Sequence, residues 1–399
     1  MAAGLSLAEL GRTIHYTKGH LSRVETSDKA PNPDLARLCD AALDADGALL
    51  AFASTVRTPD IAAGGQLPPS GNDDWTLDHA IDGADETALA AAARDEITVD
   101  KLRTLFNESV AWGELVSSRI VLPTVMAQAN TAWSLALAAP VETRSALTTL
   151  AALNATYAGW LALETGDDHA AMRWSRTAVS LARRVDDANL IAYTLIRQAQ
   201  VALFRDEPEH VLTMVGQIAD DARVSARFRG IAAHREAQGH AVLGNYDQCR
   251  RALDRSTALL PETSAPTMFD GAVLPPMANG GAHVGGVIAG WCLHDLGRPQ
   301  AAVNVLDREL VRMNRTHRRA TARFGARRVL AYVAAGEIDE ACVLARELLD
   351  IAAVVDSATV RMELRRLARA LARWRTHPPV RELNPLLADA LRTPTTACS

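Results

Sequence analysis

Several side chains able to donate hydrogen bonds lie close together near the N-terminus. They belong to TIHYTKGHLSRVE, residues 13–25, and are Thr17, Lys18, His20, Ser22 and Arg23. Ammonium, guanidinium and hydroxyl groups of this kind contact phosphate oxygens and base edges of nucleic acids. The chemistry that this stretch predicts is therefore recognition of a nucleic acid.

Three short helices are expected to position these side chains. Ser6 can cap a helix, LAELGRTI, and Thr17 can cap a second one, KGHLSRVE. PNPDLARLCDAALD then opens with the proline and aspartate that favour a third helix. Two short helices joined by a tight turn, with a third helix packed on them, make a helix-turn-helix, whose second helix enters the major groove of DNA.

The stretch from SLAELGRTIHYTKGHLSRVE through PNPDLARLCDAAL resembles the Cro/repressor-like (XRE) family of helix-turn-helix regulators. The resemblance implies double-stranded DNA as the partner and places Lys18 and Arg23 at base-contacting positions. It places Ser6 and Thr17 where helix ends meet phosphates. His20 and Ser22 complete the candidate DNA contacts.

The N-terminal segment departs from that family in two respects. The family has a helix of about ten residues before this point, whose arginine often pairs with the position of Glu25, whereas only MAAGL precedes Ser6. Residues 1–57 also carry six Lys and Arg against seven Asp and Glu, so one copy attracts phosphate weakly. Two hypotheses stay open: the natural start lies upstream of Met1, or the helix-turn-helix is a truncated remnant.

The rest of the chain predicts a linker followed by helices. Residues 58–74 gather proline, glycine and polar residues as linkers do, and residues 75–139 predict a helical connecting region. From 140 to 393 a repeat recurs, in which a residue that ends one helix is followed five positions later by a small or apolar one. The helix-ending residues are Gly166, Asp206, Gly244, Gly297 and Gly336, and a small or apolar residue lies seven positions before each, at Gly159, Ala199, Ala237, Gly290 and Val329.

A glycine that ends a helix adopts a left-handed conformation, and a small residue at a helix crossing allows close approach. Helix pairs of this kind bury their faces only against neighbouring pairs. YAGWLALETGDDHAAMRWSRTAVSLA and GHAVLGNYDQCRRALDRSTALLP resemble tetratricopeptide (TPR) repeats with lengthened helices. With the N-terminal segment, they resemble the long helix-turn-helix regulators common in actinobacteria. The predicted fold class is all-α: a truncated helix-turn-helix followed by a TPR-like α-solenoid.

The first helix of each repeat is expected to line the concave face of the solenoid. Counting from the turns places aromatic, amide and basic side chains on that face: Tyr157, Trp160, Tyr193, Arg197, His234, Gln238, Trp291, Arg323 and Arg327. Because arginine binds a carboxylate through two parallel hydrogen bonds, this groove suits a peptide or a small acid as effector. The alternative is that several of the aromatic residues are ordinary core between repeats.

The sequence predicts neither catalysis nor a metal or cofactor. NGGAHVGGVIAGW is glycine-rich but lacks the spacing of a phosphate-binding loop, and the candidate histidine and cysteine pairs lack zinc-ligand spacing. An arginine run at 312–328 and an arginine stripe at 361–373 are expected to be solvated helix faces. Scattered cysteines, no signal peptide and no apolar run of about 20 residues predict a cytoplasmic protein outside the membrane. Because the sequence shows no serine elbow, no Cys/His pair with an orienting group and no paired carboxylates in apolar surroundings, it is not expected to be an enzyme.

The leading hypothesis is a cytoplasmic transcriptional regulator that binds DNA through its N-terminal segment. Its repeats would sense an effector or mediate assembly. A homodimer is expected because two linked DNA-binding segments gain effective concentration on a palindromic site. The alternative is a TPR-like protein-interaction scaffold whose helix-turn-helix no longer binds DNA.

Overall fold

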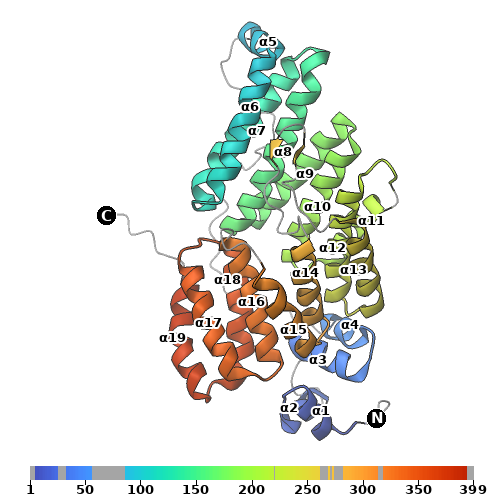
Figure 1. Ribbon diagram of the computed structural model, residues 1–399, viewed down its shortest axis with the longest axis vertical. Coiled ribbons are helices and arrows are strands. Elements are labelled where there is room, and N and C mark those ends of the chain that lie inside the picture. The colour runs from blue at the N-terminus through green and yellow to red at the C-terminus, as the bar shows by residue number, and fades with distance from the viewer. Residues whose placement is uncertain are drawn as a thin grey trace.

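The computed structural model describes most of the chain as helices packed in chain order (Figure 1). The described residues are 5–25, 33–55, 86–219, 221–260, 268–269, 272–273, 282–312 and 318–392. The linker expected at 58–74 lies outside them. We call residues 5–55 the head and residues 86–392 the array.

The head has the three expected helices, α1 (Leu7–Thr13), α2 (Lys18–Glu25) and α3 (Pro33–Leu43). Ser6 caps α1 reciprocally: its hydroxyl accepts from the amide of Glu9, and the Glu9 carboxylate accepts from the amide of Ser6 at 2.8 Å. This capping box satisfies amides that the first turn leaves free. A small apolar core holds the three helices together, formed by Leu10, Ile14, Leu21, Leu35 and Leu38.

A fourth helix, α4 (Ala48–Thr55), adds to the helices expected in the head. Its start is fixed by Asp40, a buried residue of α3 whose carboxylate accepts from the amides of Gly47 at 2.8 Å and Leu49 at 2.9 Å. The intervening turn uses left-handed backbone at Asp44, Asp46 and Gly47. A carboxylate that satisfies two free amides at a helix start stabilises that helix by about 1 kcal/mol.

The array is a succession of helices in which each packs against the next, except that α17 packs on α16 and α19 and α18 packs on α16 and α19. They are α5 (Glu86–Arg94), α6 (Glu96–Gly113), α7 (Ser118–Ala138), α8 (Val141–Thr165), α9 (Asp168–Val185), α10 (Ala188–Phe204), α11 (Pro208–Ala219), α12 (Ala226–Val242), α13 (Tyr246–Leu259), α14 (Ala282–Asp295), α15 (Pro299–Leu310), α16 (Arg318–Ala334), α17 (Ile338–Ala353), α18 (Ala358–Leu371) and α19 (Pro378–Leu391), with a 3-10 turn at Ala372–Trp374. Strands β1 (Met268–Phe269) and β2 (Ala272–Val273) form a short antiparallel pair. The chain is thus an all-α protein apart from this pair, as far as its described residues go.

The turns that the repeat spacing predicts are confirmed. Gly166, Gly244, Gly297 and Gly336 have φ angles of 90°, 78°, 71° and 83°, and the degenerate copy at Asp206 has 61°. The small residues at the crossings also pack as expected. A Cβ atom placed on Gly290 would lie 2.6 Å from Cγ of Leu306 in α15, so only glycine permits this approach of α14 and α15.

The helices α8, α10, α12, α14, α16 and α18 form an inner layer, in which each packs on the next one of the set. The layer turns back on itself, because the start of α18 lies against the end of α8 (Figure 1). There the hydroxyl of Thr359 donates to the buried Glu164 carboxylate at 2.9 Å, and the hydroxyl of Ser357 donates to the same carboxylate. The inner helices consequently enclose a packed interior.

Two helices, α7 and α8, are long and apolar enough to cross a membrane, which corrects the expectation that no apolar stretch approaches that length. In α8, 89% of the most apolar window is buried inside the protein, and in α7 44% is buried. Both belong to the largest apolar core, which runs from Ala93 in α5 to Ala331 in α16. Burial by neighbouring helices accounts for the apolar composition of α8.

Candidate functional site

The start of α2 is held by the turn that precedes it. The hydroxyl of Thr17 accepts from the amide of His20 at 3.2 Å, which caps the helix. A Cβ atom on Gly11 would lie 2.5 Å from the carbonyl oxygen of Tyr16, so glycine is required where α1 meets the turn. Lys18, the first residue of α2, is exposed. The cap and the close approach therefore present the N-terminus of α2, with its lysine, to solvent.

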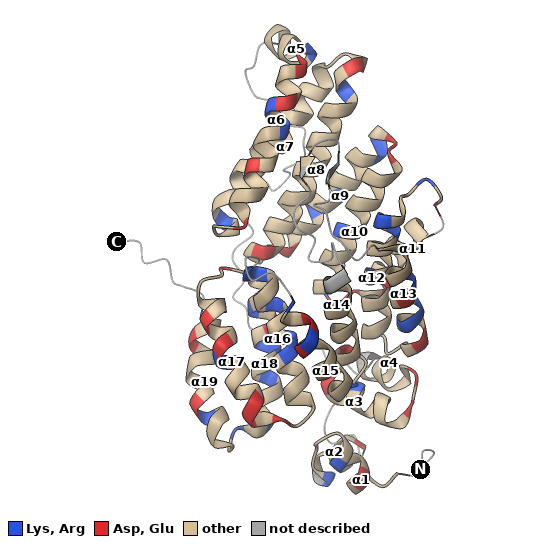
Figure 2. Ribbon diagram, in the orientation of Figure 1, with Lys and Arg blue, Asp and Glu red and all other residues tan. Residues whose placement is uncertain are grey.

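The other predicted DNA contacts lie around this helix start. Ser6 is at the exposed N-terminus of α1, where its hydrogen bonds lower the pKa of the Glu9 carboxyl. The ring of His20 packs edge-on against Tyr16, with centroids 5.2 Å apart, and Ser22 is half-buried in α2. Arg23 belongs to α2, but its side chain lies outside the described atoms. Figure 2 shows both signs of charge on α1 and α2.

The head packs against the turns of the array. At the α12–α13 turn, a Cβ atom on Gly244 would lie 2.7 Å from Cα of Gly47, and one on Gly47 would lie 2.4 Å from the carbonyl oxygen of Leu243. At the α14–α15 turn, a Cβ atom on Gly297 would lie 2.4 Å from the carbonyl oxygen of Arg37. The left-handed glycines of consecutive repeats thus make backbone contact with the head, a relationship that sequence reasoning missed.

The helix-turn-helix turn contacts the next repeat along. A Cβ atom on Gly336, in the α16–α17 turn, would lie 2.7 Å from Cε1 of His15. The guanidinium of Arg373 stacks over the ring of Tyr16 at 4.6 Å from its centroid and donates to the carbonyl oxygen of Val333 at 3.2 Å. These contacts join the residues just before α2 to the far part of the array, so the array fixes the position of the presented helix.

The residues expected along an open concave groove lie instead mostly in the interior. Tyr157, Tyr193, Arg197, His234, Gln238, Trp291, Arg323 and Arg327 are each at most 4% exposed, and Trp160 is half-buried. The expectation of an open groove is corrected for a physical reason: α18 returns to α8 and closes the inner layer. Whether these residues bind an effector stays a prediction.

The structure gathers part of this set around Trp160. The guanidinium carbons of Arg197 and Arg323 lie 4.8 and 5.3 Å from the centroid of its ring. Arg197 donates to the side-chain carbonyl of Gln200 at 3.0 Å, and Arg323 lies 3.7 Å from the carboxylate of Glu164. Burial lowers the pKa of both arginines. We call Trp160, Arg197, Arg235, Gln238 and Arg323 the arginine cluster.

The arginine cluster includes two residues of α12. Arg235 donates to the side-chain carbonyl of Gln238. Burial, and then the charges of Arg197 and Arg323, lower the pKa of Arg235 to about 9. The three cations therefore lie close enough to repel one another.

The second part of the set forms a paired network. Arg327 stacks over Trp291 at 4.0 Å and contacts the carboxylates of Asp295 at 2.7 Å and Glu363 at 2.8 Å. The indole N–H of Trp291 donates to Asp295 at 2.8 Å. Burial alone would raise the pKa of Asp295, but the positive charges around it, of which Arg327 is the strongest, together lower it to about 2. These four residues form ion pairs and hydrogen bonds with one another and behave as structural core.

The three remaining predicted groove residues pack on other aromatic rings or lie next to the arginine cluster. Tyr157 faces α6, with its ring edge-on to Phe106 at 6.4 Å, and Tyr193 packs on Phe228 at 6.3 Å. Burial raises the pKa of Tyr193 and lowers that of His234 to about 3, so His234 is neutral at physiological pH. Burial raises the pKa of Tyr157 as well, and the charge of Arg197 acts on both tyrosines, so they border the arginine cluster.

The expectation that the arginine run at 312–328 and the stripe at 361–373 are solvated faces holds for Arg318, Arg365 and Arg369, which are exposed, and is corrected for other members, which are paired. Arg319 donates to the carbonyl oxygens of Gly113 and Val116, and Arg328 contacts the Asp307 carboxylate. Figure 2 shows the basic residues of α16 beside acidic ones of neighbouring helices. Arg361 contacts Asp356 at 2.9 Å. The spacing identified the charges but not their partners, which come from other helices.

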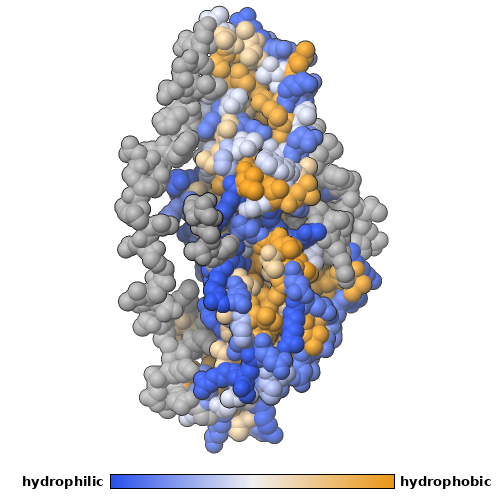
Figure 3. Space-filling view, turned by 90° about the vertical axis from the view of Figure 1, so that its left-hand side faces the viewer, coloured by the Kyte–Doolittle hydropathy of each residue, from blue (hydrophilic) through white to orange (hydrophobic). Residues whose placement is uncertain are grey.

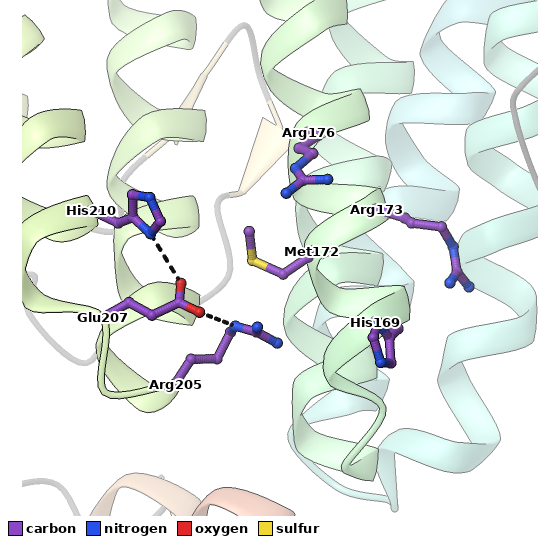
Figure 4. A pocket seen from close by; sticks show the side chains of 7 residues that line it. All are labelled: His169, Met172, Arg173, Arg176, Arg205, Glu207 and His210. Atoms are coloured by element: carbon purple, nitrogen blue, oxygen red, sulfur yellow. Dashed lines mark hydrogen bonds and ion pairs between the residues drawn. The ribbon is translucent and has the colours of Figure 1, made fainter. Parts of the chain in front are cut away.

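A surface hollow of about 310 Å³ lies between α9 and the α10–α11 turn (Figure 4). Basic side chains dominate its lining, which consists of His169, Met172, Arg173, Arg176, Arg205, Glu207 and His210. Glu207 contacts Arg205 at 2.9 Å and His210 at 3.3 Å. The hollow is open to solvent, and the Glu207 carboxylate neutralises part of its positive charge. Among the described residues, no group of three or more His, Cys, Asp and Glu could hold a metal ion.

Comparison with known proteins bears on the head. A family model described as a helix-turn-helix domain matches residues 1–53. The comparison with curated proteins gives no significant match. The matched segment ends within α4, so it contains the capped α1, the turn and the exposed start of α2. The chain therefore has an N-terminal helix-turn-helix domain, a type of domain that points to DNA binding and transcriptional regulation, followed by a long helical region.

Proposed function

We propose that this chain is a cytoplasmic, DNA-binding transcriptional regulator of XRE type, with a TPR-like α-solenoid as its regulatory part. The observation that carries the proposal is the exposed start of α2, with Lys18 first, on a helix-turn-helix whose caps and core are intact. In this motif the N-terminal residues of the second helix reach base edges. Lys18 and Arg23 would read bases, while Ser6, Thr17, His20 and Ser22 would position the head on the backbone.

The contacts between head and array support a regulatory role for the array. Gly244, Gly297 and Gly336 meet the head through backbone or ring contacts that leave no free space. A change in the relative tilt of α12, α14 and α16 would therefore move the head as a body. An effector that favours one tilt would shift the population of DNA-binding placements.

We expect tight binding to DNA to require two heads. The head carries few basic residues, and a homodimer doubles the contacts on a palindromic site. Apolar patches on the side of the molecule where α6 and α19 lie (Figure 3) offer surface for such an assembly. The exposed apolar side chains of these two helices include Leu105 and Trp112 of α6 and Leu386 of α19.

The test is binding of the full chain to a fluorescent fragment of its own upstream DNA, measured by anisotropy against random DNA of equal length. We expect preference for the upstream fragment, and loss of that preference in Lys18→Ala/Arg23→Ala. Arg94→Ala/Lys101→Ala, which removes two charges of α5 and α6, is the matched control and should bind like wild type. Equal binding of both DNAs by the wild type would contradict the proposal and favour a protein-interaction scaffold.

A further inference from the structure

Arg197 and Arg323 of the arginine cluster share the charge of one buried carboxylate, that of Glu164. Glu164 is 3.7 Å from Arg323, but its oxygens already accept hydrogen bonds from Ser357 and Thr359. Arg197 has an amide partner, Gln200, and no ion-pair partner among the described residues. A buried cation without a counter-charge is costly, because desolvation is not offset by attraction.

Several donors of the cluster have no hydrogen-bond acceptor. Nη2 of Arg197, Nη1 of Arg323 and Nε2 of Gln238 are buried and unbonded, and the hydroxyl of Tyr193, one turn before Arg197, is unbonded too. These groups come from α10, α12 and α16, three helices of the inner layer. Each buried polar group without a partner costs about 1–3 kcal/mol. The one buried carboxylate oxygen without a hydrogen bond among the described residues, Oε2 of Glu363, lies 2.8 Å from Nε of Arg327, so it is not an acceptor for these donors. Unbonded donors from separate helices therefore indicate a missing acceptor.

The surroundings of the cluster are aromatic. Trp160 packs on Phe204 at 6.2 Å, Phe204 on Trp291 at 6.3 Å, and Trp291 on Phe324 at 5.8 Å. Trp160 is half-buried, so this edge of the cluster is within reach of solvent. A guanidinium matches the planar geometry of a carboxylate with two parallel hydrogen bonds, and aromatic rings match an apolar body.

We infer that the arginine cluster is a binding site for an organic monocarboxylate with an apolar body, held by Arg197, Arg323 and Gln238 against the ring of Trp160. The carboxylate would supply the missing charge and the missing acceptors together. The site deepens the proposed effector role of the array and rests on that role for its regulatory meaning. Because α12 and α16 also carry the turns that meet the head, occupancy would be transmitted to α2 through Gly244 and Gly336.

The test uses thermal unfolding of the full chain with phenylacetate, octanoate, inorganic phosphate and uncharged 2-phenylethanol as probes. A ligand that binds the folded state raises the midpoint in proportion to occupancy. We expect a saturable rise with phenylacetate or octanoate and none with 2-phenylethanol. No saturable rise with either carboxylate would overturn the inference, as would an equal rise with 2-phenylethanol. A rise with phosphate alone would overturn the carboxylate class.

Variants of Arg197 make the test specific. Arg197→Met should raise the half-saturating concentration of the carboxylate at least tenfold. Arg197→Lys keeps the positive charge but cannot make two parallel hydrogen bonds to a carboxylate, so it should raise this concentration less. Arg184→Met is the matched control, because Arg184 also stacks on a tryptophan, Trp133 at 5.1 Å, but is exposed. An unchanged half-saturating concentration in both Arg197 variants would overturn the site.

The same samples are assayed for binding to the upstream DNA fragment. A normal carboxylate shift without DNA preference would count against the proposed function alone. DNA preference without a carboxylate shift would count against this site alone.

Discussion

Gly47 of the head and Gly244 of the array lie back to back, and a Cβ atom on Gly244 would come within 2.7 Å of Cα of Gly47. Both residues have left-handed backbone, with φ of 86° and 78°. Glycine is thus required at each position for two reasons: the turn there needs left-handed backbone, and the other glycine lies too close to leave room for a side chain. The contact ties the head to the array through backbone, which cannot rotate away as a side chain can.

Gly244→Ala is expected to release the head from the array. The new methyl group would meet the backbone of Gly47 and Cδ1 of Leu50, so the head must shift. Hydrogen exchange of the α3 and α4 amides, measured by mass spectrometry, should speed up relative to wild type.

Gly166→Ala is the matched control for that experiment. Gly166 has the same left-handed backbone, with φ of 90°, but its new Cβ would meet Cβ of Ala358 at an ordinary 3.5 Å. Both variants should lose about 1–2 kcal/mol of stability from backbone strain. Faster exchange in α3 and α4 should appear in Gly244→Ala alone, and equal exchange in the two variants would refute the head contact.

Replacement of the buried arginines should have opposite effects on stability. Arg197→Met removes an unpaired buried charge, so we expect the free energy of unfolding to rise by about 1 kcal/mol or more in buffer without organic acids. Arg327→Met leaves Asp295 without its ion pair and Glu363 with Arg366 alone, and we expect a loss of about 3–5 kcal/mol. Urea unfolding of the wild type and the two variants measures both changes in the free energy of unfolding. A loss in Arg197→Met as large as that in Arg327→Met would show that Arg197 is fully paired.

The array should lose stability as the pH falls below about 6.5. Burial lowers the pKa of His234 to about 3 and that of His294 to about 4 in the folded state, whereas both titrate near 6.5 when unfolded. The unfolded chain therefore binds protons first, so the contribution of these residues is complete above pH 6.5 and is lost as the pH falls toward 4. For His234 the slope is at most about 1.4 kcal/mol per pH unit.

Urea midpoints between pH 7 and 4.5 measure this dependence. His234→Gln should flatten it, and His169→Gln, a change at an exposed histidine, should leave it as in wild type. Identical pH profiles for His234→Gln and wild type would contradict the assignment.

Local features of the fold could be predicted from the sequence. The spacing of Gly166, Asp206, Gly244, Gly297 and Gly336 identified every one of these left-handed turns, because such turns depend on a residue's own backbone preferences. The caps at Ser6 and Thr17 were predictable for the same reason. Helix α4 was not predicted, although the sequence contains a usable signal for it. Asp40 lies seven residues before Gly47, and its carboxylate accepts a hydrogen bond from the Gly47 amide.

Contacts between residues far apart in the sequence could not be predicted in this way. Counting from turns placed Arg197 and Arg323 on the correct face of their helices, but not in the interior, because that depends on Ser357 and Thr359 reaching Glu164 far along the chain. The pairing of Arg327 with Asp295 and Glu363 depends on the same closure. Periodicity identifies which residues share a face, and only the assembled inner layer decides whether that face is open.

The most direct measurement is a salt titration of the full chain on its upstream DNA fragment and on random DNA. The account predicts tighter binding to the upstream fragment at every salt concentration, with both affinities falling as salt rises because phosphate contacts release counterions. In Lys18→Ala/Arg23→Ala the difference between the two DNAs should vanish. A wild-type chain that binds neither DNA at low salt, or binds both equally, would contradict the claim that the exposed start of α2 reads DNA sequence.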